Sequence, residues 1–145
     1  MQSILFVCLG NICRSPAAEG VVRRRLPELM LDSAGTGGWH VGAAPYGPMQ
    51  AAARARGYDL SALRARQFGP ADFANFDMIF AMDDANMRYI EAQRPRGKTT
   101  PVENFAALAG ADAVPDPYYT RDFEGCLDLI EACAAALSRR FAAPR

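Results

Sequence analysis

The stretch Ile4-Leu5-Phe6-Val7-Cys8-Leu9-Gly10-Asn11-Ile12-Cys13-Arg14-Ser15-Pro16 decides the fold of this chain. Its first four residues form an unbroken apolar run, which predicts a central parallel strand covered on both faces. Ser15 followed by Pro16 is typical of a helix N-cap and a first-turn proline. A short glycine-containing loop is therefore expected to join the carboxyl end of a strand to a helix amino terminus.

This loop combines a thiol, a guanidinium and backbone N–H groups beside the positive end of a helix dipole. Such N–H groups favour an anion, and helix termini and nearby cations favour the ionised form of a cysteine, here Cys8. Arg14 can hold two phosphoryl oxygens bidentately, which would place a phosphorus atom opposite the sulfur. The pattern indicates nucleophilic attack on phosphorus and a phosphocysteine intermediate.

Two other interpretations of the loop are less consistent with its context. A buried structural cysteine beside a surface arginine would not need the glycine, the Ser-Pro pair and the helix that follow. A nucleotide-binding loop would end in Gly-Lys-Ser/Thr or show Gly-x-Gly-x-x-Gly after the first strand, and the sequence has neither.

The segment 7–19 resembles the signature of the low-molecular-weight protein tyrosine phosphatases. Further segments resemble blocks of that family in the same order and extend the resemblance over nearly the whole chain: 32–36, 65–67, 76–77, 81–83 and 116–119. The resemblance implies a phosphotyrosine phosphatase, acting on aryl phosphate monoesters, with Cys8 as nucleophile and Arg14 as the phosphate-binding catalytic residue.

The family uses a distant aspartate as general acid, and the matching position is Asp116. A phenolate whose conjugate acid has a pKa near ~10 departs more readily when it is protonated. Pro115 and Pro117 stiffen the backbone on either side of this carboxylate. Pro-Asp-Pro alone would be an ordinary turn. Asp83, at the end of a predicted strand, is expected either to support the loop or to act only as a helix cap.

The resemblance also assigns residues to substrate binding. They are the loop residues Leu9, Gly10, Asn11, Ile12, Cys13 and Ser15, and the aromatic residues Trp39, Tyr118 and Tyr119. Aromatic walls would favour an aryl phosphate over an alkyl phosphate. An exposed loop aromatic is the alternative for Trp39.

Three loop-supporting roles follow from the same resemblance. Asn11 is expected to hold the strained loop by side-chain hydrogen bonds, Ser15 to donate to the thiolate, and Ser33 to join this network. The chain departs from the family at Leu63, where a histidine that bonds to the loop asparagine is common. Support of Asn11 is therefore expected from Ser33 and backbone groups.

The other cysteines have more than one interpretation. In the family, a second loop thiol at the position of Cys13 forms a reversible protective disulfide with the nucleophile; a small buried thiol is the equal alternative. Cys126 and Cys133 fall on the apolar stripe of a last helix, over 123–141, and are expected in the core. With no Cys-x-x-Cys pair and one histidine, the sequence predicts neither a metal site nor a cofactor.

The remaining patterns predict alternating helices and strands. Helices are expected from Ser15 to Leu26, over 48–56 and over 84–94, and strands over 29–35, 78–82 and, weakly, 99–102. This alternation predicts an α/β, doubly wound parallel sheet with a ligand crevice at the strand carboxyl ends. The resemblance implies four strands in the order 2-1-3-4 with helices on both faces, a flavodoxin- or Rossmann-like fold. At 145 residues, one domain over 1–145 is expected.

Charge and composition restrict the partners. Lys and Arg number 16 and Asp and Glu 16, so no net field favours nucleic acid or a membrane surface. The initial apolar run is too short for a signal peptide, and four cysteines suit a reducing compartment, so a cytoplasmic location is expected, with export by another route left open. The resemblance implies tyrosine-phosphorylated protein substrates, a tyrosine kinase as a candidate partner, and a monomer.

Three rival functions stay open. Phosphoarginine phosphatases of the same fold tend to have threonine where this chain has Ile12, whose larger apolar side chain favours an aryl group. An arsenate reductase would need relay cysteines where the chain has Ala81 and Met82. A non-catalytic phosphotyrosine-binding module would be expected to lose Cys8 or Asp116, and the chain has both.

Overall fold

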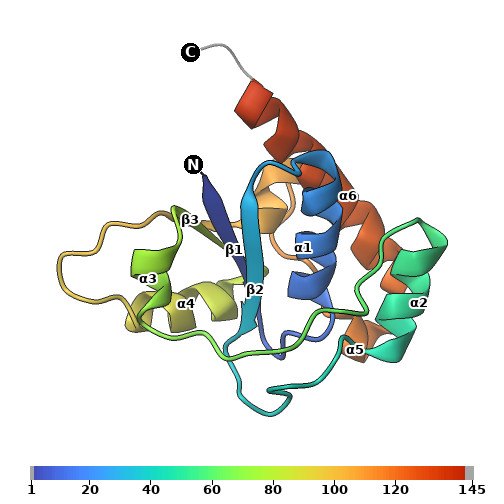
Figure 1. Ribbon diagram of the computed structural model, residues 1–145, viewed down its shortest axis with the longest axis horizontal. Helices are drawn as coiled ribbons and strands as arrows, with labels where there is room; N and C mark the ends of the chain where they lie inside the picture. Colours follow the sequence, from blue (N-terminus) through green and yellow to red (C-terminus); the bar gives the residue numbers. More distant parts are fainter. Residues whose placement is uncertain (1, 143–145) are drawn as a thin grey trace.

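The central apolar run forms strand β1 (Ser3–Cys8), and all of its residues are buried. In the computed structural model, which describes residues 2–142, β1 lies between β2 (Met30–Gly35) and β3 (Met78–Ala81). A short strand β4 (Val102–Asn104) completes a parallel sheet of order β2-β1-β3-β4 (Figure 1). The predicted strand order and parallel sheet are confirmed.

Helices cover both faces of this sheet (Figure 1). One face carries α1 (Arg14–Arg25), α2 (Gly47–Ala55) and α6 (Phe123–Ala142), and the other carries α3 (Asp72–Asn75) and α4 (Asp84–Ala92). Because successive side chains of a strand point to opposite faces, β1 contributes to two separate apolar cores. Ile4 and Phe6 belong to the core under α1 and α6, while Leu5 and Val7 belong to the core under α3 and α4.

Three local predictions were wrong, each for a physical reason. Helix α1 begins at Arg14 with Cys13 as its N-cap residue, because the hydroxyl of Ser15 bonds to side chains of the loop instead of capping the helix. The fourth strand begins only at Val102, since Pro101 has no N–H and offers the ladder only its carbonyl, to Ile79 N. Phe141 is 36% exposed in the last turn of α6 and is not part of the core. The other predicted elements differ only at their ends.

The carboxyl ends of the strands gather the segments that matter for function. The loop 9–13 follows β1, the loop 36–46 follows β2, and Asp83 follows β3. The chain after β4 passes through a 3₁₀ turn, η1 (Phe105–Ala109), and returns to the same edge as the short helix α5 (Pro117–Thr120). No helix among residues 2–142 has the length and apolar composition needed to cross a membrane.

Candidate active site

Cys8 is the last residue of β1, and the loop that follows folds back over its sulfur. The backbone N–H of Asn11 lies 3.3 Å from Sγ of Cys8, and Oγ of Ser15 lies 3.0 Å from the same sulfur. Asn11 adopts a left-handed backbone with φ 58°, a conformation that asparagine tolerates better than most residues. A side chain at Gly35 of β2 would approach the carbonyl of Leu9 to 2.9 Å, so the glycine allows the strand to lie against the loop.

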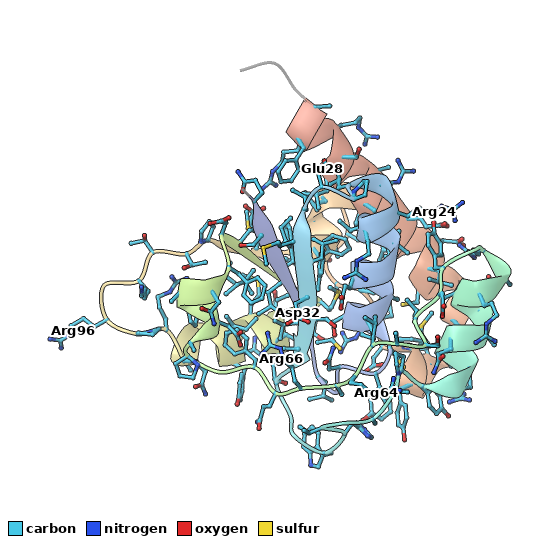
Figure 2. The ribbon with its side chains drawn as sticks, viewed as in Figure 1. Arg24, Glu28, Asp32, Arg64, Arg66 and Arg96 are labelled. Atoms are coloured by element: carbon cyan, nitrogen blue, oxygen red, sulfur yellow. The ribbon has the colours of Figure 1, made fainter. Side chains whose placement is uncertain are left out.

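The side chain of Asn11 holds the loop through three hydrogen bonds. Its Oδ1 accepts at 3.0 Å from the backbone N–H of Arg66, whose side chain bonds to Asp32 of β2 (Figure 2). Its Nδ2 donates to Oγ of Ser15 at 2.8 Å and to Oγ of Ser33 at 2.9 Å. The expected support from Ser33 and a backbone group is therefore present, and Leu63, at the position of the family histidine, packs against the apolar core instead.

Arg14 is almost fully buried, with 3% of its surface exposed. Its Nη1 donates to Oδ2 of Asp83 at 2.7 Å and to the carbonyl of Val114 at 3.0 Å, while Nη2 lies 3.4 Å from Oδ2 of Asp116. Burial acts to lower the pKa of Arg14, but the nearby Cys8, Asp83 and Asp116 outweigh it and raise the pKa above its usual value. The guanidinium is thus a fixed cation.

One donor of this cation has no partner. Among the described residues, Nε of Arg14 is a buried nitrogen without a hydrogen bond in the protein. A buried donor without a partner is costly, and a charged donor more so. An anion bound beside Cys8 would satisfy it, because guanidinium groups bind phosphate oxygens in pairs.

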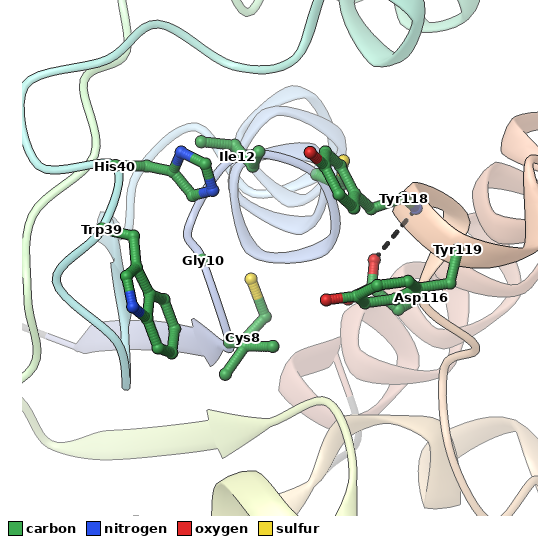
Figure 3. Close-up of a pocket in the computed structure, with 10 residues that line it drawn as sticks. Cys8, Gly10, Ile12, Trp39, His40, Asp116, Tyr118 and Tyr119 are labelled. Carbon is green, nitrogen blue, oxygen red and sulfur yellow. Dashed lines mark hydrogen bonds between the residues drawn. The ribbon is translucent and has the colours of Figure 1, made fainter.

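The two candidate carboxylates occupy different positions. Asp116 is the N-cap of α5, and its Oδ1 accepts from the backbone N–H of Tyr118 at 3.1 Å (Figure 3). Asp83 combines both roles considered for it: Oδ2 accepts from Arg14, while Oδ1 caps α4 by accepting from the N–H of Asn86 at 2.8 Å. Asp116 lines the cavity above Cys8, whereas Asp83 is not among the residues that line it.

A cavity of about 350 Å³ opens above the sulfur. Cys8 lies on its floor, with Trp39 and His40 on one side and the residues of α5 on the other (Figure 3). The lining residues are Cys8, Leu9, Gly10, Ile12, Cys13, Trp39, His40, Asp116, Tyr118 and Tyr119. Most of the predicted site residues are thus brought together in one cavity.

Three predicted site residues are not among those that line the cavity. The side chains of Asn11, Arg14 and Ser15 are buried, at 2%, 3% and 0% exposure. Their side chains bond to one another, to Cys8 and to residues that surround the loop, as described above. His40 lines the cavity but was not predicted as a site residue. The sequence feature that could have indicated it is its position next to Trp39 as the one histidine of the sequence.

The aromatic walls differ in exposure. Trp39 is 74% exposed and Tyr119 70% exposed, while Tyr118 packs between Tyr46 and Tyr119 with ring centroids 5.1 and 5.3 Å apart. The indole of Trp39 lies directly on Gly37, where any side chain would collide with the ring. Tyr118, although 40% exposed, is therefore packed against two rings, while the faces of Trp39 and Tyr119 are more open to solvent.

All four cysteines are free thiols in the structure. Burial, followed by the charges of Asp116 and Cys8, raises the pKa of Cys13 far above its usual range. Burial also raises the pKa of Cys126 to about 12 and that of Cys133 to about 11. These three thiols are therefore neutral at ordinary pH, and Cys126 and Cys133 lie in the core as predicted. Within residues 2–142, no three potential metal ligands cluster.

Comparison with known proteins agrees with this geometry. The family model described as "Low molecular weight phosphotyrosine protein phosphatase" matches residues 3–144. The low molecular weight phosphotyrosine protein phosphatase of Schizosaccharomyces pombe is 43% identical, over 80% of this chain and 80% of its own. The Bacillus subtilis low molecular weight protein-tyrosine-phosphatase YfkJ is 38% identical, over 90% of each chain.

A solved structure gives the same result. The crystal structure of a protein tyrosine phosphatase from Entamoeba histolytica, with Hepes in its active site, superposes with a TM-score of 0.91 at 33% identity. The match covers 98% of this chain and 97% of that one. Family model, relatives and structure confirm the resemblance found in the sequence: the chain belongs to the low molecular weight phosphotyrosine protein phosphatase family.

Proposed function

We propose that this chain hydrolyses phosphotyrosine in proteins through a phosphocysteine intermediate on Cys8, with Asp116 as general acid. The observation that carries the proposal is the buried Arg14, whose Nε lacks a partner, beside a thiol on the floor of a cavity lined by Asp116. As a member of its family, the chain is a phosphoric monoester hydrolase. The two chemical steps follow from these positions.

In the first step the Cys8 thiolate attacks phosphorus while the bond from phosphorus to the tyrosyl oxygen breaks. Asp116 gives its proton to the leaving oxygen, which departs as neutral tyrosine. Arg14 and the N–H groups of the loop stabilise the charge on the phosphoryl oxygens. The sulfur then carries the phosphoryl group.

In the second step a water molecule attacks the phosphocysteine, and Asp116, now a carboxylate, takes its proton. The phosphorus–sulfur bond breaks, inorganic phosphate leaves, and the thiolate is restored. The hydroxyl of Ser15 and the N–H of Asn11, which lie 3.0 and 3.3 Å from Sγ, make the sulfur a better leaving group. The balance is one ester and one water giving tyrosine and phosphate, and no step requires a metal.

The shape of the cavity supports an aryl ester as substrate. Ile12 lies in the wall and offers an apolar surface to a ring, as do Tyr118 and Trp39. A short alkyl phosphate would bring fewer contacts to the same walls and would hold its phosphorus farther from the floor. Tyrosine-phosphorylated proteins are the substrates we propose for a monomeric cytoplasmic enzyme, with a tyrosine kinase as a candidate partner.

The test is phosphate release in EDTA from matched phosphotyrosine, phosphoarginine and phosphoserine peptides, with the Cys8→Ser protein as blank. A strong preference for phosphotyrosine is expected. Preference for phosphoarginine would show that Ile12 does not select an aryl group and would favour the related phosphatase activity. No release from any peptide would overturn the proposal in favour of binding without catalysis or arsenate reduction.

A further inference from the structure

The hydrogen-bond network around Asn11 continues beyond the loop to a buried carboxylate. Oγ of Ser33 donates to Oε1 of Glu19 at 2.8 Å, and Oε2 of Glu19 accepts from Nη2 of Arg23 at 2.6 Å. Glu19 belongs to α1 and is 3% exposed, while Ser33 belongs to β2 and is 4% exposed. A carboxylate is rarely buried to this degree unless it is paired, and Ser33 and Arg23 are the partners here.

Counting protons fixes the direction of the bonds that the Asn11 side chain makes. The backbone N–H of Arg66 can only donate, so Oδ1 of Asn11 must face it and Nδ2 must face the hydroxyl groups. The two hydrogens of Nδ2 are then used on Ser15 and Ser33. Each serine accepts from Asn11 and has one hydroxyl proton left to give.

The remaining protons point in opposite directions. That of Ser33 goes to the Glu19 carboxylate, which is an acceptor only. That of Ser15 has two acceptors within reach, Sγ of Cys8 at 3.0 Å and the carbonyl of Ala34 at 3.4 Å, and the sulfur is the nearer. The chain of bonds therefore ends at a carboxylate on one side and at the nucleophilic sulfur on the other.

We propose that Glu19 is a positioning residue for the nucleophile, which acts through Ser33 and Asn11 to direct the hydroxyl proton of Ser15 onto the sulfur of Cys8. Because Ser33 gives its proton to Glu19, its hydroxyl can only accept from Asn11, and this bond holds the Asn11 side chain together with the N–H of Arg66. In this chain, which has Leu63 where the family commonly has a histidine, the carboxylate is the outer end of the loop's support. The inference rests on the proposed function, because it concerns the thiolate that attacks and leaves.

Removing the Glu19 charge has two effects of opposite sign on the pH at which the Cys8 thiolate forms, and this makes the inference testable. In Glu19→Gln the side-chain oxygen would remain with Arg23 and the amide would donate to Ser33, so the proton of Ser33 would lose its acceptor. If the relay operates, the thiolate loses stabilisation and forms at higher pH. If only electrostatics matters, loss of a nearby negative charge makes the thiolate form at lower pH.

The experiment measures the pH profile of Cys8 alkylation by iodoacetate, together with kcat, for the wild type, Glu19→Gln, Ser33→Ala and the double variant. We expect the midpoint of the profile to rise by about one pH unit in Glu19→Gln and kcat to fall about tenfold, the equivalent of one hydrogen bond. Because Glu19 acts through Ser33, the double variant should match Ser33→Ala within error. A lowered or unchanged midpoint, or additive losses in the double variant, would overturn the proposal.

Two further variants keep the test decisive. Glu19→Asp retains the charge but shortens the side chain, so it should raise the midpoint as Glu19→Gln does, and it replaces that variant if Glu19→Gln fails to fold. Arg23→Gln removes the ion pair, whose arginine is 48% exposed, and leaves the bond to Ser33. If Arg23→Gln reproduced the whole effect of Glu19→Gln, the ion pair and not the relay would be responsible. Alkylation does not require turnover, so failure of the proposed phosphatase activity would be seen separately in the wild type.

Discussion

Replacement of Asp116 by asparagine separates its chemical role from its structural one. Oδ1 of Asp116 caps α5 by accepting from the N–H of Tyr118, and asparagine ranks with aspartate as an N-cap residue. Oδ2 is not used by the cap and lies 3.4 Å from Nη2 of Arg14. The Asp116→Asn variant should therefore fold normally and lack only the acidic proton.

The size of the loss depends on the leaving group. Proton donation by a positioned acid contributes about 10²- to 10⁴-fold, which is about 2.7 to 5.4 kcal/mol of activation free energy. We expect a loss of kcat/KM in this range for phosphotyrosine, whose phenol has a pKa near ~10. For aryl phosphates with more acidic phenols, which leave readily without a proton, the loss should shrink steadily.

The assay is kcat/KM against pH for a series of aryl phosphates that differ in phenol acidity. If Asp116 is the general acid, the fall of the rate on the alkaline side in the wild type should disappear in Asp116→Asn. Asp112→Asn, the same substitution at an exposed position of the same segment, is the matched control. Equal losses across the series, or an unchanged alkaline limb, would show that another group is the acid.

Three further predictions follow from the site. Asp83→Asn and Asp83→Ala should both lower kcat/KM about 10- to 100-fold, because Arg14 loses a charge-assisted hydrogen bond. Only the alanine variant should also lose about 1 kcal/mol of unfolding free energy, because it removes the cap of α4. Equal stabilities of the two variants in urea titrations would contradict this. Burial raises the pKa of Glu19, despite Arg23, so ionisation of Glu19 costs stability as pH rises through the folded-state pKa. The melting temperature of Glu19→Gln relative to wild type should thus increase with pH across the acid range, and a relative decrease would mean that the ion pair outweighs burial. At neutral pH, iodoacetamide should label Cys8 alone by peptide mass spectrometry, because the raised pKa values of the other three cysteines keep them protonated; prompt labelling of Cys13 would refute that.

The parts of the fold that the sequence predicts are those set by local patterns. The apolar run before Cys8 marks a strand buried on both faces, and the stripe through Cys126 and Cys133 marks the buried side of α6. Ser15 shows the limit of such patterns. It lies inside the helix instead of capping it, and its hydroxyl bonds to Asn11 and to the sulfur of Cys8. A helix cap and a buried network use the same residue type, and only the tertiary fold decides between them.

The same limit applies to the site. Cys8, Ile12, Asp116 and the aromatic residues were predicted, and all line one cavity. The role of Glu19 could not be predicted, because its partner Ser33 lies on another element and no local spacing connects the two. The backbone N–H of Arg66 donates to Asn11 from 55 positions farther along the chain, and no residue type marks such a bond in the sequence.

The central claim is that the phosphoryl group is transferred to the sulfur of Cys8, and the direct measurement is to trap this phosphocysteine. An aryl phosphate with an acidic phenol, mixed with the enzyme in EDTA and quenched with denaturant during turnover, should leave a phosphoryl group on the peptide that contains Cys8, detected by mass spectrometry and absent from Cys8→Ala. Phosphate release without a phosphoryl group on Cys8, or with one on another residue, would contradict the account.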